Sequence, residues 1–124
     1  MKKVLFVCSQ NKLRSPTAES VFSQFPELEC ESAGTDSSAN VPLDPELIQW
    51  ADVIFAMERS HRSKITKKFK KHLNGKRMVV LGIPDDYAYM DPVLIKVLQA
   101  KVGPLLGVHF DHHSAQPIDA LDAR

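Results

Sequence analysis

The stretch that decides the fold is FVCSQNKLRSPTAE, residues 6–19. An apolar run ends at Cys8, five residues follow, and Arg14 is succeeded at once by Ser15 and Pro16. The apolar run is typical of a strand buried on both faces of a parallel sheet. Ser15 and Pro16 are the residue types of a helix N-cap and of a first helical position, which predicts a helix beginning at Pro16. The chain therefore opens as strand, loop and helix.

The same alternation of apolar runs and helical patterns continues along the chain. Asp44-Pro45 and Asp91-Pro92 repeat the N-cap pattern and predict the starts of two further helices. The predicted strands are residues 4–7, 28–35, 52–57 and 77–83, and the predicted helices are residues 16–25, 45–50, 58–73 and one from 92 that presents Val93, Leu94, Val97, Leu98 and Val102 on one face. After Gly103 the pattern loses its period, which predicts a loop, with residues 107–124 as a loop or flexible tail.

Strands that alternate with helices predict an α/β fold. We expect one domain over residues 1–124, built on a four-stranded parallel sheet with helices on both faces. Ligands bind such sheets at the carboxyl ends of the strands. Cys8 and Asp85 both follow a predicted strand directly, so they are expected at the same edge of the sheet.

Composition narrows the class of partner and compartment. The chain has 124 residues and a net charge of +1, so no overall field favours nucleic acid or a membrane as partner. The apolar run near the N-terminus is too short for a signal peptide, and no stretch reaches the length of a membrane span. The two cysteines, Cys8 and Cys30, are too few for a disulfide scaffold, which favours a reducing cytoplasm.

The loop between Cys8 and Ser15 has the chemistry of an oxyanion site. It runs from a strand end to a helix N-terminus, where backbone N–H groups lack helical partners and gather around an anion. Arg14 can offer a planar fork to two oxygens of that anion, and the Ser15 hydroxyl can donate to the sulfur of Cys8. The positive surroundings favour a thiolate, which would attack the phosphorus of a bound phosphate monoester and form a phospho-cysteine. The alternative is a buried core cysteine with a surface arginine.

The sequence here resembles the low-molecular-weight protein tyrosine phosphatase family, whose phosphate-binding loop reads C-x-G-N-x-C-R-S-P-x-A-E. The matching residues are Cys8, Asn11, Arg14, Ser15, Pro16, Ala18 and Glu19. Three later segments are similar to the family in the same order: ESAGT at residues 31–35, ADVIFAME at 51–58 and IPDDY at 83–87.

The resemblance implies the family fold, a nucleophilic Cys8, a phosphate-binding Arg14, and no metal or cofactor. The phosphate would be surrounded by the loop residues Ser9, Gln10, Asn11, Lys12, Leu13 and Ser15. Gln10 stands where the family has glycine, so the backbone there needs an ordinary conformation or strain. Leu13 replaces a second cysteine, and Lys12 occupies a position that in the family helps to select the substrate. Asn11 is expected to hold the loop through bonds to backbone groups.

Three aspartates compete for the role of general acid, which protonates the leaving oxygen. Asp85 precedes Tyr87 by two residues, as the family's acid precedes its tyrosine, so we predict Asp85. Asp86 is the second choice. Asp91 is the third, because helix capping explains it. Tyr87 is expected to flank the substrate ring, although an ordinary loop tyrosine fits the sequence equally well.

The predicted function is a phosphomonoester hydrolase, most simply of the protein-tyrosine-phosphatase type, acting on a phosphorylated substrate. A phosphatase of a small metabolite or nucleotide, an arsenate reductase and a non-catalytic phosphate-binding module remain alternatives. Arsenate reduction requires further cysteines, and none follows Cys30. The physiological substrate and the oligomeric state are left open by the sequence.

A basic run and a histidine-rich segment do not require a functional explanation. The basic run at residues 67–77 fits the solvated face of a helix, with a phosphate-rich partner as the alternative. The histidines His109, His112 and His113 invite a metal, but no other ligands stand at a convincing spacing, so we expect none.

Overall fold

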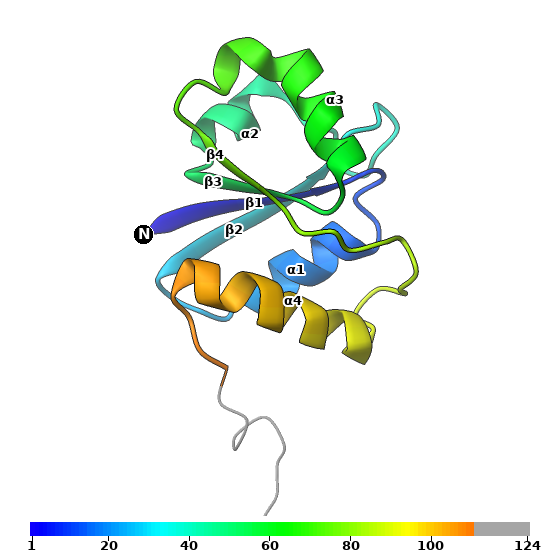
Figure 1. The fold of residues 1–124 in the computed structure, drawn as a ribbon, viewed down its shortest axis with the longest axis vertical. Coiled ribbons are helices and arrows are strands. Elements are labelled where there is room, and N and C mark those ends of the chain that lie inside the picture. Colours follow the sequence, from blue (N-terminus) through cyan, green and yellow to red (C-terminus); the bar gives the residue numbers. More distant parts are fainter. Residues whose placement is uncertain (111–124) are drawn as a thin grey trace, which may run out of the picture.

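The computed structural model describes residues 1–110 as an α/β fold with four parallel strands in the order β2-β1-β3-β4 (Figure 1). The elements in chain order are β1 (Lys2–Cys8), α1 (Arg14–Phe22), β2 (Leu28–Gly34), α2 (Pro45–Trp50), β3 (Val53–Ala56), α3 (Arg59–Phe69) with a 3-10 turn (Lys70–His72), β4 (Arg77–Val80) and α4 (Pro92–Leu106). The predicted fold class is confirmed. No helix within residues 1–110 has the length and apolar character needed to cross a membrane.

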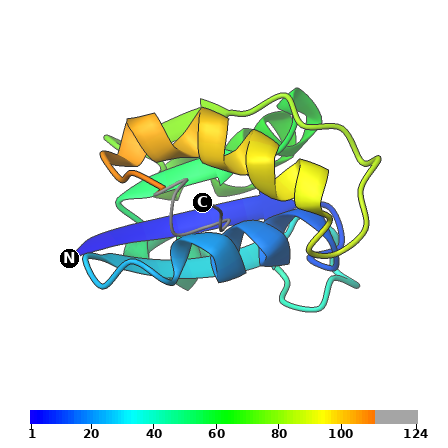
Figure 2. The same ribbon diagram turned by 90° about the horizontal axis from the view of Figure 1, so that it is seen from below.

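The helices cover the sheet in two layers. Helices α1 and α4 lie side by side on one face, and α2 and α3 lie on the other (Figures 1 and 2). The central strand β1 is buried on both faces, and its side chains alternate between the two cores. Phe6 faces α1 and α4, where its ring stacks on Phe22 and Phe55 at centroid distances of 5.7 and 5.5 Å. The apolar run of β1 therefore holds the two layers together.

The carboxyl ends of all four strands meet at one edge of the sheet. Cys8 at the end of β1 pairs with Gly34 at the end of β2, and Ala56 of β3 pairs with Val80 of β4. The connections from β1 to α1, from β2 to α2 and from β4 to α4 consequently gather at this edge (Figure 1). The topology predicts that any ligand binds there.

The start of α1 differs from the sequence prediction. The helix begins at Arg14 and its N-cap is Leu13, which has no capping side chain, so the prediction of Ser15 as N-cap was wrong. Pro16 is the third helical residue, where an N–H would lack a helical partner in any case. The Ser15 hydroxyl is consequently free to bond elsewhere.

The sequence prediction for the end of α4, a loop after Gly103, was also wrong. The helix continues through Gly103 and Pro104 to Leu106, and the stop signal is Gly107, which has a left-handed φ of 69°. The Gly107 N–H bonds to the carbonyl oxygens of Gly103 and Pro104, a glycine cap that satisfies the last turn. Gly103 is buried, and a Cβ there would lie 3.3 Å from the Val108 oxygen, which explains a glycine inside the helix.

Other boundaries agree with the sequence to within a few residues. Asp91 caps α4 as predicted, with its Oδ1 accepting from the Val93 N–H at 2.8 Å. Val93 itself is 57% exposed, so its predicted place on the buried face was wrong. Residues 111–124, with His112 and His113, lie outside the described part of the chain.

Candidate active site

A cavity of about 180 Å³ opens at the carboxyl edge of the sheet, beside the N-terminus of α1. Its lining residues are Cys8, Ser9, Gln10, Lys12, Leu13, Arg14 and Asp85. Most of the loop between β1 and α1 is therefore brought together with one aspartate from the connection after β4. The sequence predicted both groups, and the fold places them around one space.

The segment that follows β2 donates hydrogen bonds to the backbone carbonyls of the β1–α1 loop. The N–H groups of Thr35 and Asp36 donate to the carbonyl oxygens of Cys8 (2.9 Å) and Ser9 (3.0 Å). Asn40 then donates twice, from its backbone N–H to the Gln10 oxygen at 3.0 Å and from its side-chain Nδ2 to the Asn11 oxygen at 3.1 Å. Four consecutive loop carbonyls are thus turned away from the cavity.

This arrangement sets the direction of the loop amides. In a planar trans peptide the N–H points opposite to the C=O of the same peptide unit. Outward carbonyls from Cys8 to Asn11 therefore turn the N–H groups of Ser9 to Lys12 inward. Together with the N-terminus of α1, these donors form a concave arrangement of the kind that binds anions.

Asn11 shapes the loop through its side chain and its backbone. Its φ is 57°, a left-handed conformation that asparagine tolerates better than most residues. Its Nδ2 lies 3.0 Å from Ser15 Oγ and 2.9 Å from Ser32 Oγ, so its side-chain partners are hydroxyls and not the backbone groups expected. Gln10, at the family's glycine position, has no positive φ, which agrees with the ordinary conformation predicted as one alternative.

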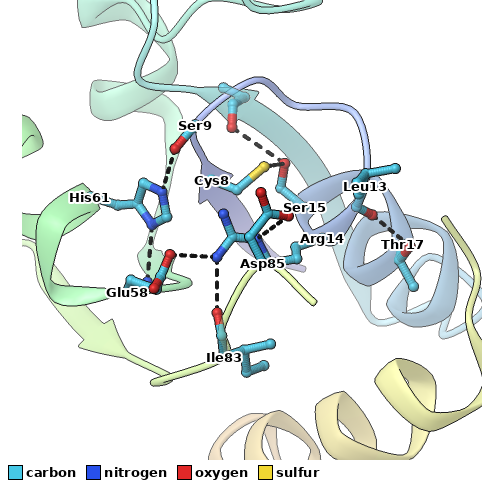
Figure 3. A network of polar contacts seen from close by, with 11 residues as sticks. Cys8, Ser9, Leu13, Arg14, Ser15, Thr17, Glu58, His61, Ile83 and Asp85 are labelled. Atoms are coloured by element: carbon cyan, nitrogen blue, oxygen red, sulfur yellow. Dashed lines mark hydrogen bonds and ion pairs between the residues drawn. The ribbon is translucent and has the colours of Figure 1, made fainter. Parts of the chain in front are cut away.

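Cys8 sits at the end of β1 with only 3% of its surface exposed. Its Sγ lies 2.9 Å from Ser15 Oγ, the contact expected from the sequence (Figure 3). Because Asn11 donates to Ser15, the serine keeps its own hydrogen for another acceptor, and the sulfur is nearer than the Ala33 oxygen at 3.4 Å. The serine can therefore stabilise negative charge on the sulfur.

Arg14 is buried and held from one side. Its Nη1 donates to Glu58 Oε1 at 2.7 Å and to the Ile83 oxygen at 2.9 Å, and its Nε lies 3.7 Å from Asp85 Oδ1 (Figure 3). Glu58 also caps α3 through its side chain. The guanidinium is thus fixed at its Nη1 end, and the alternative of a surface arginine was wrong.

His61 connects the β1–α1 loop to the start of helix α3. Its Nε2 lies 2.9 Å from Ser9 Oγ, and its Nδ1 accepts from the Glu58 N–H at 3.0 Å (Figure 3). The side chain is almost fully buried, and burial together with the nearby Arg14 charge lowers the pKa of His61 to about 4. The imidazole is therefore neutral at physiological pH.

The structure separates the three acid candidates. Asp85 lines the cavity and approaches Arg14, whereas Asp91 caps α4. Asp86 is exposed and is not among the cavity-lining residues. Tyr87 is half-buried and packs against the core between the sheet and helices α1 and α4, and it does not line the cavity. Their chemical roles stay predictions.

Several residues that build the site were not singled out from the sequence. Glu58 could have been found, because it follows the third strand almost directly, as Cys8 and Asp85 follow theirs. His61 has no local signal beyond its place in the first turn of the helix that follows this strand. Thr17 and Asn40 carry no local signal, because their partners lie far away in the sequence.

Within residues 1–110, no second thiol lies beside Cys8 and no cluster of metal-ligating side chains is present. Within residues 1–110 no group of three or more potential ligands could hold a metal ion. Cys30 lies on β2 opposite Val4, four residues before the partner of Cys8. Burial, with Glu19 and Glu31 nearby, raises the pKa of Cys30 to about 11, so this thiol stays protonated.

The parallel α/β fold places a thiol, an arginine and an aspartate around one cavity beside the loop between β1 and α1. Residues 3–51 match the family model described as low molecular weight phosphotyrosine protein phosphatase. The match covers less than half of the chain and falls on the segment that carries the resemblance seen in the sequence. No curated protein matches the chain in sequence.

Solved structures with this fold cover most of the chain. The YwlE arginine phosphatase from Geobacillus stearothermophilus has a TM-score of 0.64 and 24% identity, over 91% of this chain and 100% of that chain. The tyrosine phosphatase Wzb from Escherichia coli K30 has a TM-score of 0.66 and 19% identity, over 81% and 92%. The SP-PTP low molecular weight protein tyrosine phosphatase from Streptococcus pyogenes has a TM-score of 0.69 and 20% identity, over 85% and 93%.

Proposed function

We propose that this protein hydrolyses phosphate monoesters in the manner of a protein tyrosine phosphatase, through a phospho-cysteine intermediate. The observation that carries the proposal is the single cavity lined by Cys8, Arg14 and Asp85. Chemistry needs a nucleophile, a charge-stabilising group and an acid at one place, and a binding module needs only the second of these. The retained thiol therefore favours an enzyme.

The first step transfers the phosphoryl group to the protein. The loop amides and Arg14 hold the non-bridging oxygens, which places the phosphorus in front of Cys8 Sγ. The sulfur forms a bond to phosphorus while the bond from phosphorus to the leaving oxygen breaks. Asp85 gives its proton to that oxygen, so the leaving group departs as a neutral alcohol or phenol.

The second step returns the enzyme to its starting state. A water molecule attacks the phospho-cysteine and forms a bond to phosphorus, and the S–P bond breaks to restore the thiolate. Asp85, now ionised, takes the proton of that water. Ser15, 2.9 Å from the sulfur, stabilises the thiolate as it leaves. Because a reduced thiol is required throughout, the cytoplasm is the compartment that fits this reaction.

The substrate is proposed as phosphotyrosine on a protein, with a small phosphorylated metabolite or nucleotide as the second candidate. The fold shared with an arginine phosphatase adds phosphoarginine to the substrates that require testing. Arsenate reduction is less well supported, because the one other cysteine, Cys30, lies further down the sheet with a raised pKa. A thiol relay from Cys8 to Cys30 has no evident route.

The test is a panel of phosphotyrosine peptides, phosphoarginine peptides, sugar phosphates and nucleotides, assayed with the wild type and with Cys8→Ser. We expect turnover of phosphotyrosine by the wild type, none by Cys8→Ser, and nearly none by Arg14→Ala. Phosphate release from a substrate that Cys8→Ser processes equally well would contradict the proposal. Phosphate binding without any turnover would favour the non-catalytic module.

The acid is tested with a matched pair of variants. Asp85→Asn should lower kcat for phenyl phosphate, a poor leaving group, by roughly 10²-fold, because a general acid contributes about 10²–10⁴-fold. Asp91→Asn should keep the activity, since asparagine caps a helix as well as aspartate. If Asp91→Asn abolishes turnover and Asp85→Asn has no effect, the assignment of Asp85 is wrong.

A further inference from the structure

The connection that carries Asp85 is tied at both ends to the first turns of α1. At its start, the Ile83 oxygen accepts from Arg14 Nη1 at 2.9 Å. At its end, the Met90 N–H donates to Thr17 Oγ1 at 2.9 Å. Within residues 84–90 every side chain except the half-buried Tyr87 is exposed, so packing alone holds this segment weakly. The two hydrogen bonds therefore fix the two ends of the segment, while Tyr87 packs against the core between them.

Thr17 is built to accept the second of these bonds. Its side chain is fully buried, and its hydroxyl donates to the Leu13 oxygen at 2.6 Å (Figure 3). With its hydrogen committed to Leu13, the hydroxyl oxygen has lone pairs left for the Met90 N–H. The Leu13 oxygen also accepts from the Thr17 backbone N–H at 3.2 Å, so this carbonyl would keep a partner without the hydroxyl. The Met90 N–H is the group that depends on it.

The backbone conformation of Met90 explains why its hydrogen bond to Thr17 is important. Its φ of 60° is a left-handed conformation that a non-glycine residue adopts at an energetic cost. Such a conformation persists only where neighbouring contacts enforce it. Met90 directly precedes Asp91, the cap of α4, so the bond to Thr17 fixes the junction between the Asp85 segment and that helix.

We propose that Thr17 is a positioning residue, which holds the segment of residues 84–90 so that the Asp85 carboxylate stays over the cavity. The inference rests on the proposed function, in which Asp85 is the general acid. Within residues 1–110, Thr17 makes no hydrogen bond to Cys8 or Arg14. Its effect on catalysis is therefore expected only through the proton transfers that Asp85 performs.

The experiment compares Thr17→Val, which keeps the shape of the side chain and loses the hydroxyl, with Thr17→Ser, which keeps the hydroxyl. Thr17→Val should lower kcat/KM for phenyl phosphate, which reports the transfer of the phosphoryl group to Cys8, by about tenfold, because small displacements of a catalytic group are costly. It should change kcat/KM for p-nitrophenyl phosphate, a good leaving group, and inhibition by inorganic phosphate much less. Amide hydrogen exchange should accelerate at Met90. Thr17→Ser should restore all these values.

The outcomes separate this inference from the proposed function. An equal loss for both esters, or Met90 exchange unchanged in Thr17→Val while Asp85→Asn shows its leaving-group dependence, overturns the role of Thr17 alone. No leaving-group dependence in Asp85→Asn overturns the acid assignment and the positioning role with it. If Thr17→Val fails to fold, as judged by circular dichroism, Thr17→Ala is measured in the same way against Thr17→Ser.

Discussion

The imidazole of His61 joins the loop between β1 and α1 to helix α3 through one hydrogen bond, 2.9 Å long, between its Nε2 and Ser9 Oγ. Its Nδ1 accepts from the Glu58 N–H, so the hydrogen of the neutral ring is on Nε2 and is donated to Ser9. A second proton on Nδ1 would face that N–H and break the contact. Protonation of His61 is consequently opposed by the fold.

We predict that the protein loses stability as the pH falls from about 6.5 to about 4. The pKa of His61 is lowered from 6.5 to about 4 in the folded state, so between these values the unfolded chain binds the extra proton. Stability therefore rises with pH across this window, and the full difference is about 3 kcal/mol. Urea unfolding at a series of pH values measures it.

A matched pair of histidine variants identifies the source of that slope. His61→Gln should remove most of the dependence between these pH values, whereas His109→Gln, which changes an exposed histidine, should retain it. An unchanged slope in His61→Gln would show that other groups control the acid sensitivity.

Alkylation should distinguish the two thiols. The pKa of Cys30 is raised to about 11, so near pH 8 its nucleophilic thiolate is scarce. Iodoacetate should modify Cys8 first, and inorganic phosphate should slow this reaction by occupying the loop. Peptide mapping by mass spectrometry reads out both sites. Comparable labelling of Cys30, or labelling of Cys8 that ignores phosphate, would contradict the assignment.

Asn40→Ala should weaken phosphate binding by about two- to tenfold. The variant loses the side-chain bond to the Asn11 oxygen and keeps the backbone bond to Gln10, and one such bond contributes about 0.5–1.5 kcal/mol. Inhibition by phosphate of p-nitrophenyl phosphate turnover gives the affinity. Ser38→Ala is the control, because Ser38 makes only a 3.5 Å contact to Gln10. Equal losses of phosphate affinity in the two variants would show that the bond from Asn40 to the Asn11 oxygen does not support phosphate binding.

Gly34→Ala should destabilise the protein by about 1–3 kcal/mol, the usual cost of forcing extra atoms into a packed site. An added Cβ would lie 2.4 Å from the Ser9 oxygen and 2.5 Å from Ala39 Cβ. Gly103→Ala is the comparison, since its Cβ would meet the Val108 oxygen at 3.3 Å. Thermal unfolding of both variants decides the point, and equal melting temperatures would mean that β2 and the loop are less closely packed than described.

The sheet and the position of the loop between β1 and α1 could be predicted because their signals are local. The run before Cys8, and the Asp-Pro pairs at residues 44–45 and 91–92, each specify an element within a few residues. The helix ends were harder to predict. The last turns of α4 pass through Gly103 and Pro104, two residues that usually end a helix, because Gly103 packs against the chain that follows it.

The supports of the site could not be predicted, since their partners are distant in the sequence. Ser9 and His61 are 52 residues apart, Asn11 and Asn40 are 29 apart, and Thr17 and Met90 are 73 apart. A serine, an asparagine or a threonine in a loop or helix has no pattern that specifies such a partner. Only the order of the strands, which places their carboxyl ends together, brings these residues into contact.

The anchoring of Arg14 by Glu58 and Ile83 affects how tightly an anion can be held. Ordering a free arginine side chain costs about 1.5–2 kcal/mol of conformational entropy. Here that loss occurs when the chain folds, because the Nη1 end of the guanidinium already has two protein partners. An incoming dianion meets a rigid receptor and has no arginine to immobilise, so more of its contact energy remains as affinity.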